Sequence, residues 1–314
     1  MTTIHSAARP PGRREFLGHL SAAAVAAATG LGPAAAAPAA TALPTITLGR
    51  HRISRLIAGW NPIGGYSHTT LDMARAMREW FTAERTVEFL RGCERNGITA
   101  WQYDYTDKAV AALRLARARG SQLKVICLHA ERRFDAPLRA VLADTAPIAV
   151  VHHGGVTDAL FRAGQGQRVR DFVKRVKDHG LLAGVSSHCP DHVRRIADAG
   201  WENDFFMTCF YYVNRTAEEQ RRLLGKVVVG EPFFESDPDD MTAVMRQVGK
   251  PCLGFKILAA GRSCWSASEV EEAFRHAFAR IKPSDGLIVG LFPRYSDQVA
   301  EDASLARKYG GARP

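Results

Sequence analysis

The stretch Ala149-Val-Val-His152-His153-Gly-Gly-Val-Thr-Asp158 indicates the fold of this chain most directly. A short apolar run over 147–151 is typical of a buried strand, and it ends in two histidines followed by two glycines. A parallel α/β barrel carries its chemistry at the carboxyl ends of its strands, in loops of this kind. If this interpretation is right, the other strands of the chain should also end in polar residues.

The same alternation of short apolar runs and amphipathic segments repeats along the chain. Strands are expected at 54–61, 98–103, 123–129, 148–152, 183–187, 205–210, 252–257 and 287–290. Because a helical segment follows each run, the pattern favours a parallel sheet with helical crossovers. Eight such units favour a closed (β/α)8 TIM barrel over an open sheet. Residues 45–53 are expected to form a short hairpin that plugs the bottom of the barrel.

The first 42 residues have the features of an export signal rather than of a fold. The segment Gly12-Arg13-Arg14-Glu15-Phe16-Leu17 precedes an Ala-rich stretch and small-residue cleavage sites, as in twin-arginine signals. We therefore expect residues 1–42 to be removed and the protein to be periplasmic or otherwise extracytoplasmic, without a stable membrane anchor. Residues 43–314 match one barrel of about 250 residues, with insertions at about 62–81 and 226–240.

The composition of the chain argues against nucleic-acid binding and against a cysteine-based zinc site. The chain is 46% hydrophobic and 24% charged, which is ordinary for a globular protein. Its net charge of +10 comes mostly from arginines on predicted helices, with no stripe interleaved with aromatics. This pattern favours a solvated helix surface over nucleic-acid binding. The six cysteines show no zinc-binding spacing, so we expect buried thiols, with one disulfide left open.

Polar residues gather at the expected carboxyl ends of the strands. They are Trp60, Asn61, Gln102, Tyr103, Asp104, Tyr105, His129, Glu131, His152, His153, Ser186, Ser187, His188, Tyr211, Tyr212, Asn214, Glu231, Lys256 and Arg294. Since these ends share one face of a barrel, the sequence predicts a site there for a small-molecule substrate.

The order of several segments resembles the aldo/keto reductase superfamily. The similar stretches are Gly97-Ile-Thr-Ala-Trp-Gln102, Val151-His152-His153-Gly154, and the segments 179–188, 251–262 and 287–301. The resemblance implies carbonyl reduction with NADPH, using a Tyr acid, a Lys, an Asp and a His. It also implies that Arg294 and Gln298 lie where the family grips the nucleotide phosphate.

This chain departs from that family at most of the catalytic positions. Gln102 occupies the position of the Asp, and Leu128-His129-Ala130 occupies that of the Lys. Tyr105 lies near the family's Tyr but out of register, so only the His is kept, as His152 or His153. A Tyr without a neighbouring cation has a pKa near 10. Because the NADPH pool is also cytoplasmic, we rank NADP below a metal as the expected cofactor.

The first functional hypothesis is metal-assisted lyase, isomerase or hydrolase chemistry on a small, polyoxygenated, sugar-like substrate. Imidazole and carboxylate ligands suit Zn, Mn or Fe(II), and the predicted ligands are His129, Glu131, His152 and His188. The predicted proton-transfer residues are Lys256, Tyr105, His153 and Asp104. An NAD(P)H-dependent reductase with a non-standard tetrad is the second hypothesis, and a non-catalytic ligand-binding barrel is the third.

Overall fold

The computed structural model describes residues 42–132 and 135–311, and every structural statement below concerns these residues. The predicted export signal lies outside them, apart from Ala42, and stays a prediction. No helix in the described ranges is long and apolar enough to cross a membrane.

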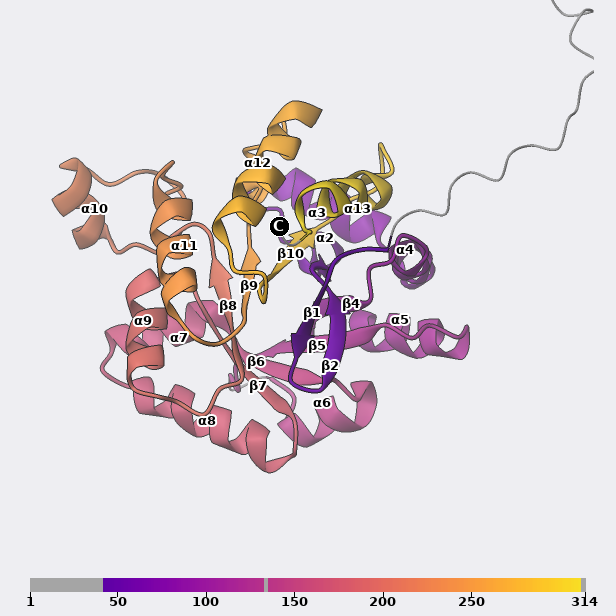
Figure 1. Ribbon diagram of the computed structural model, residues 1–314, viewed down its shortest axis with the longest axis horizontal. Helices are drawn as coiled ribbons and strands as arrows, with labels where there is room; N and C mark the ends of the chain where they lie inside the picture. The colour runs from indigo at the N-terminus through magenta and orange to yellow at the C-terminus, as the bar shows by residue number, and fades with distance from the viewer. Residues whose placement is uncertain (1–41, 133–134, 312–314) are drawn as a thin grey trace, which may run out of the picture. The chain divides into compact units, whose positions relative to one another are not determined.

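Eight parallel strands close into a barrel, which confirms the predicted (β/α)8 fold (Figure 1). Each strand pairs with its neighbours in chain order, and the last pairs with the first. The strands are β3 (Leu56–Gly59), β4 (Ala100–Asp104), β5 (Lys124–His129), β6 (Ala149–His152), β7 (Leu182–Ser187), β8 (Phe205–Cys209), β9 (Cys252–Phe255) and β10 (Gly286–Gly290).

Helices surround the strands, as the amphipathic segments predicted (Figure 1). Several begin at a Thr or Ser that caps the first turn; Thr82, for example, accepts a hydrogen bond from the amide of Arg85. The helices are α2 (Asn61–Gly64), α3 (Leu71–Trp80), α4 (Ala83–Arg95), α5 (Asp107–Ala118), α6 (Leu138–Thr145), α7 (Gly154–Arg162), α8 (Gly166–Asp178), α9 (Pro190–Asp198), α10 (Ala217–Leu224), α11 (Asp237–Gln247), α12 (Ala267–Arg280) and α13 (Gln298–Tyr309), with a 3-10 turn at Ala259–Gly261.

The barrel interior is a packed apolar core closed at one end. The antiparallel hairpin of β1 (Thr45–Leu48) and β2 (His51–Ser54) contributes Ile46, Leu48 and Ile53 to the same cluster as interior strand residues such as Phe205. The predicted bottom plug is therefore present, and the opposite, carboxyl end of the strands is left for the functional site.

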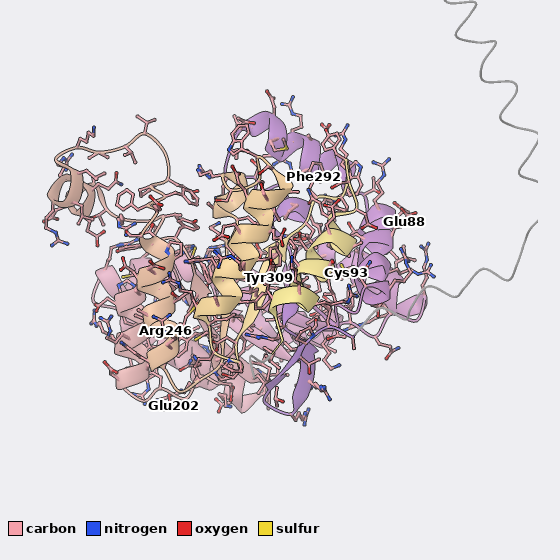
Figure 2. The ribbon with its side chains drawn as sticks, turned by 45° about the horizontal axis from the view of Figure 1, so that its top comes forward. Glu88, Cys93, Glu202, Arg246, Phe292 and Tyr309 are labelled. Atoms are coloured by element: carbon pink, nitrogen blue, oxygen red, sulfur yellow. The ribbon has the colours of Figure 1, made fainter. Side chains whose placement is uncertain are left out.

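Both predicted insertions lie beside that end. The first carries α2 and α3, and Trp80 of α3 packs edge-on against Phe292, which Figure 2 labels, with ring centroids 5.5 Å apart. Tyr309, which Figure 2 labels, ends α13 and donates a hydrogen bond to Glu271 of α12. The second insertion is a loop that follows α10, a helix standing away from the ring in Figure 1. It brings Glu231 to the mouth of the barrel.

Candidate active site

The alternation of side chains along β5 and β6 decides which histidines face the barrel. Leu128 and Val151 belong to the interior cluster. Their neighbours His129 and His152 therefore point to the opposite face, because successive side chains of a strand alternate. Both rings lie outside the wall against Phe172 of α8, at centroid distances of 6.2 and 5.0 Å.

The four predicted metal ligands consequently make separate contacts. His129 bonds through Nε2 to the carbonyl of Ala136, and Glu131 forms an ion pair with Arg175 of α8. His188 is bound to a carboxylate of α7 instead. Across the residues that the structure describes, no group of three His, Cys, Asp or Glu side chains is arranged to hold a metal ion. This geometry does not support the predicted metal centre.

The strongest polar cluster is built around Asp158, which is fully buried on α7. Its carboxylate accepts five hydrogen bonds, from Ser187 Oγ (2.5 Å), His192 Nδ1 (3.0 Å), the His188 amide (3.0 Å), His188 Nδ1 (2.9 Å) and Asn214 Nδ2 (2.7 Å). Burial alone would raise the pKa of Asp158, but the hydrogen bonds from the two histidines outweigh it and lower that pKa well below its usual range. Asp158 is therefore a fixed anion at neutral pH.

That anion sets the orientation of His188. Because the carboxylate can only accept, His188 Nδ1 carries the proton of this bond, which leaves Nε2 as the ring nitrogen that can meet a ligand. The ring lies against Phe255, an interior residue of β9, with centroids 5.6 Å apart. His188 thus presents a basic nitrogen near the barrel mouth, oriented as the imidazole is in an Asp–His pair.

A second chain of polar groups lies at the end of β9. Lys256 Nζ is 2.7 Å from His68 Nε2, and Nδ1 of the same ring is 3.0 and 3.1 Å from the two oxygens of Glu231. Asn61 Nδ2 also approaches His68 Nε2, at 3.3 Å. Since two donors converge on Nε2, that nitrogen accepts, and Nδ1–H donates to Glu231. The result is a directed chain from Glu231 through His68 to Lys256.

Two residues of this polar chain have a strained backbone, which indicates that surrounding contacts hold them in place. His68 and Lys256 have φ values of +56° and +62°, in the left-handed region that favours glycine. Burial, which outweighs the nearby thiol of Cys209 and the carboxylate of Glu231, lowers the pKa of Lys256. A lysine with a lowered pKa, in contact with an imidazole rather than a carboxylate, is suited to exchanging protons.

The loop of the second insertion packs over the polar chain of Glu231, His68 and Lys256. Arg262 lies over the ring of Phe233, 3.9 Å from its centroid, and also donates to the carbonyl of His68. Phe233 packs on Tyr211, with ring centroids 5.1 Å apart. These contacts hold the loop that carries Glu231 against the mouth.

A further carboxyl group, that of Asp104, lies on the face of β4 that points into the barrel. Gln102 and Asp104 share the face of Ala100, which belongs to the interior cluster. Gln102 is 5% exposed; its Nε2 makes no hydrogen bond of normal geometry among the described residues, although its side chain lies near enough to Asp104 to lower the pKa of that carboxyl. Burial, against the opposing effect of the Arg132 guanidinium, raises the pKa of Asp104 to about 6. A polar ligand here would meet an unsatisfied amide and a carboxyl that titrates near neutrality.

The remaining predicted residues have local partners. His153 Nδ1 accepts from the amide of Gly155, and burial lowers the pKa of His153 to about 4. Tyr105 donates to Asp144 of α6 at 2.5 Å, so its hydroxyl is engaged on the helix side. Gln298 accepts from the Phe292 amide.

Arg294, the other predicted cofactor residue, lies over the ring of Tyr295, 5.3 Å from its centroid. Neither it nor Gln298 forms part of the two polar chains at the mouth.

Two residues of the two chains, His68 and Asp158, were absent from the predicted strand-end residues, and Glu231 was among them without a predicted role. Their partners are distant in sequence: 163 positions separate His68 from Glu231, and 188 separate it from Lys256. One feature of the sequence could have indicated the Asp158 cluster. His188 and His192 are four positions apart around the start of α9, a spacing that lets both rings reach the same carboxylate.

Comparison with known proteins yields structural likeness only. No family model matches the chain, and no curated protein matches it. The apo structure of Gox0644 shares 12% identity over 87% of this chain and 97% of its own, with a TM-score of 0.50. A Gox0644 mutant in complex with NADPH shares 13% over 84% and 88%, with a TM-score of 0.51. The glycerol dehydrogenase AKR11B4 from Gluconobacter oxydans shares 12% over 86% and 98%, with a TM-score of 0.48. At such identities the likeness shows the barrel fold alone.

Proposed function

We propose that this chain is a barrel enzyme that transfers protons on a small substrate bearing carbonyl and hydroxyl groups, as sugar isomerases and lyases do. The observation that carries the proposal is the chain from Glu231 through His68 to Lys256 at the carboxyl ends of the strands. Asp158 of α7 and His188, which directly follows β7, supply a second proton-transfer group at the same end.

The directed hydrogen bonds define what each group does. The Lys256 ammonium passes a proton to His68 Nε2, and Glu231 stabilises the imidazolium that forms. The neutral amine then takes the proton from the substrate carbon next to the carbonyl. His188 Nε2 exchanges a second proton with a substrate oxygen, while Asp158 holds its ring. Gln102 Nε2, which makes no hydrogen bond of normal geometry to any described residue, is suited to donating to a substrate oxygen.

This proposal replaces metal assistance with proton transfer by the chain's own side chains, because the predicted ligands point to separate places. The substrate class, a small polyoxygenated molecule, is kept from the sequence analysis. Reduction with NAD(P)H, ligand binding without catalysis, and export to the periplasm stay predictions.

Solvent exchange tests the proposal without knowledge of the product. The protein is incubated in D2O with a panel of hydroxyaldehydes, hydroxyketones and uronates, and NMR follows deuterium at carbons next to the carbonyl. We expect exchange with at least one compound, lost in both Lys256→Met and His188→Gln. The matched controls are Lys174→Met and His179→Gln, which change exposed residues of α8 and its C-cap and should retain exchange.

The outcome that contradicts the proposal is equally definite. If no compound of the panel exchanges above the protein-free rate, the barrel binds ligands without proton transfer or performs other chemistry. If exchange survives in both Lys256→Met and His188→Gln, the two chains described above are structural.

A further inference from the structure

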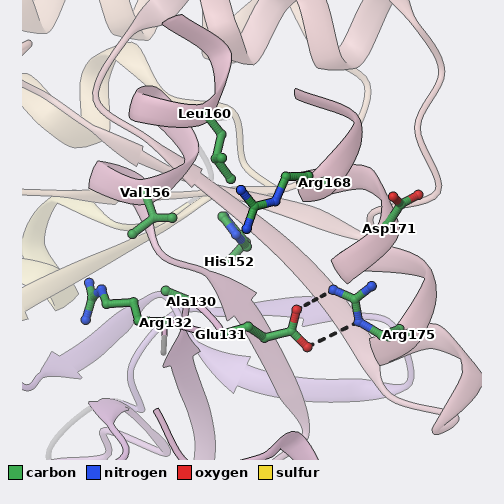
Figure 3. Close-up of a pocket in the computed structure, with 9 residues that line it drawn as sticks. All are labelled: Ala130, Glu131, Arg132, His152, Val156, Leu160, Arg168, Asp171 and Arg175. Carbon is green, nitrogen blue, oxygen red and sulfur yellow. Dashed lines mark hydrogen bonds and ion pairs between the residues drawn. The ribbon is translucent and has the colours of Figure 1, made fainter. Parts of the chain in front are cut away.

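A separate pocket lies outside the barrel wall, under α7 and α8 (Figure 3). Its volume is about 340 Å³, and it lies on the face of β6 away from the interior. Arg168, Asp171 and Arg175 reach it from α8, where their spacing puts them on one helix face. Arg132 and His152 complete its polar lining. The pocket belongs to neither polar chain of the proposed active site.

Not every arginine that lines this pocket is paired with a carboxylate. Arg175 is neutralised by Glu131, whose φ of +52° turns the chain at the end of β5. Arg168 donates only to the neutral amide oxygen of Gln165, at 3.0 Å. In the described part of the chain, the Arg132 guanidinium has no hydrogen bond or ion pair. Asp171, the other carboxylate of the lining, accepts from Gln167 and forms no ion pair with Arg168 among the described residues. Arg168 therefore borders the pocket without a carboxylate partner, whereas the charge of Arg132 also acts on Asp104, whose pKa it lowers.

The floor of the pocket is a buried histidine with an open nitrogen. His152 is 3% exposed, and its Nδ1 is 2.7 Å from Thr157 Oγ1. No hydrogen bond engages its Nε2 among the residues described. Burial first, and then neighbouring histidines and arginines, lower the pKa of His152 to about 3, so the ring is neutral. Figure 3 shows the Arg168 guanidinium above this ring, with the pair of Glu131 and Arg175 to one side and Arg132 to the other.

We propose that this pocket binds a small oxyanion, a phosphate or carboxylate group, held by Arg168 and Arg132 over the His152 ring. Guanidinium groups recognise such groups through paired, charge-assisted hydrogen bonds. A protonated oxygen of the ligand, or one that accepts from the ring, uses the open nitrogen of His152. The inference does not depend on the proposed function, because the site lies on the other side of the barrel wall.

Binding is measured by calorimetry and by thermal unfolding with inorganic phosphate, sulfate and succinate, each at ionic strength held constant with sodium chloride. We expect saturable binding of at least one of these anions, and a preference between phosphate and succinate identifies the group. Arg168→Gln and Arg132→Gln should each weaken it about tenfold or more, because each removes a charge-assisted hydrogen bond. The control Arg222→Gln, an exposed arginine of α10, should bind as the unchanged protein does.

A readout at the histidine locates the ligand. Titration should shift the ring signals of His152 in NMR spectra and leave those of His179, an exposed histidine, in place. The proposal fails if none of the three anions binds saturably. It also fails if the loss of affinity in Arg222→Gln equals that in the two pocket variants, since binding then follows net charge alone.

Discussion

Replacing Asp158 by asparagine should destabilise the fold strongly at neutral pH. The side chain is fully buried and accepts five hydrogen bonds. An amide has one accepting oxygen, so its NH2 group must face donors on one side. If the oxygen stays with the His188 bonds, the NH2 group meets Ser187, which can accept, and His192, which must change tautomer. Breaking a buried, hydrogen-bonded charge cluster in this way costs about 3–5 kcal/mol.

Urea unfolding of the two proteins at several pH values measures this cost. The folded-state pKa of Asp158 is depressed. Its contribution is therefore complete above the unfolded pKa of about 3.9 and is lost as pH falls through the folded value. The difference between Asp158→Asn and the unchanged protein should be constant above about pH 5 and shrink in acid. Asp191→Asn, which changes an exposed residue paired with Arg194, should cost under about 1 kcal/mol. Equal stability of Asp158→Asn and the unchanged protein at pH 7 would refute the reasoning.

Three further changes test other parts of the structure. Burial raises the pKa of Asp302 to about 7, so its contribution to stability is lost as pH rises towards that value. Asp302→Asn should therefore stabilise the protein by about 2–4 kcal/mol at pH 8 and hardly at pH 4, in thermal unfolding at both values. Gly154→Ala would place a methyl group 2.8 Å from the buried Ser186 Oγ and 3.1 Å from His188 Cε1, so these side chains must shift, the His188 ring signals should move in NMR spectra and the unfolding temperature should fall. Glu231→Gln removes a carboxylate that raises the pKa of Lys256, so acylation of Lys256, followed by peptide mass spectrometry, should begin at lower pH; an unchanged profile would contradict the assigned chain.

The fold could be predicted from the sequence because its signal is local and repeated. Each strand is a short apolar run, and each following helix has its own amphipathic face and often a capping residue such as Thr82. Eight consistent units leave few alternatives. The place of the site followed from the same pattern, since the carboxyl ends of parallel strands share one face.

The choice between neighbouring histidines could not be made in that way. Parallel strands are buried on both faces, so β6 reads as Ala149–His152 with all four residues buried and shows no alternation of polar and apolar side chains. A shift of one position moves every side chain to the other face. His152 therefore faces α8, while His153 lies on the face of Val151. The strand end was predictable, but the side of the wall was not.

The chain from Glu231 through His68 to Lys256 depends on features that no local pattern contains. Its residues come from two insertions and a strand end, and loops of such length are not constrained by periodicity. Lys256 also adopts a left-handed backbone conformation, which a sequence usually indicates by a glycine and which a lysine does not predict. A non-glycine residue keeps that conformation only where surrounding contacts hold it. The strain at Lys256 and His68 therefore indicates that the loops are fixed to bring these two side chains together, which is the reason to place the chemistry there and not at the histidines of the wall.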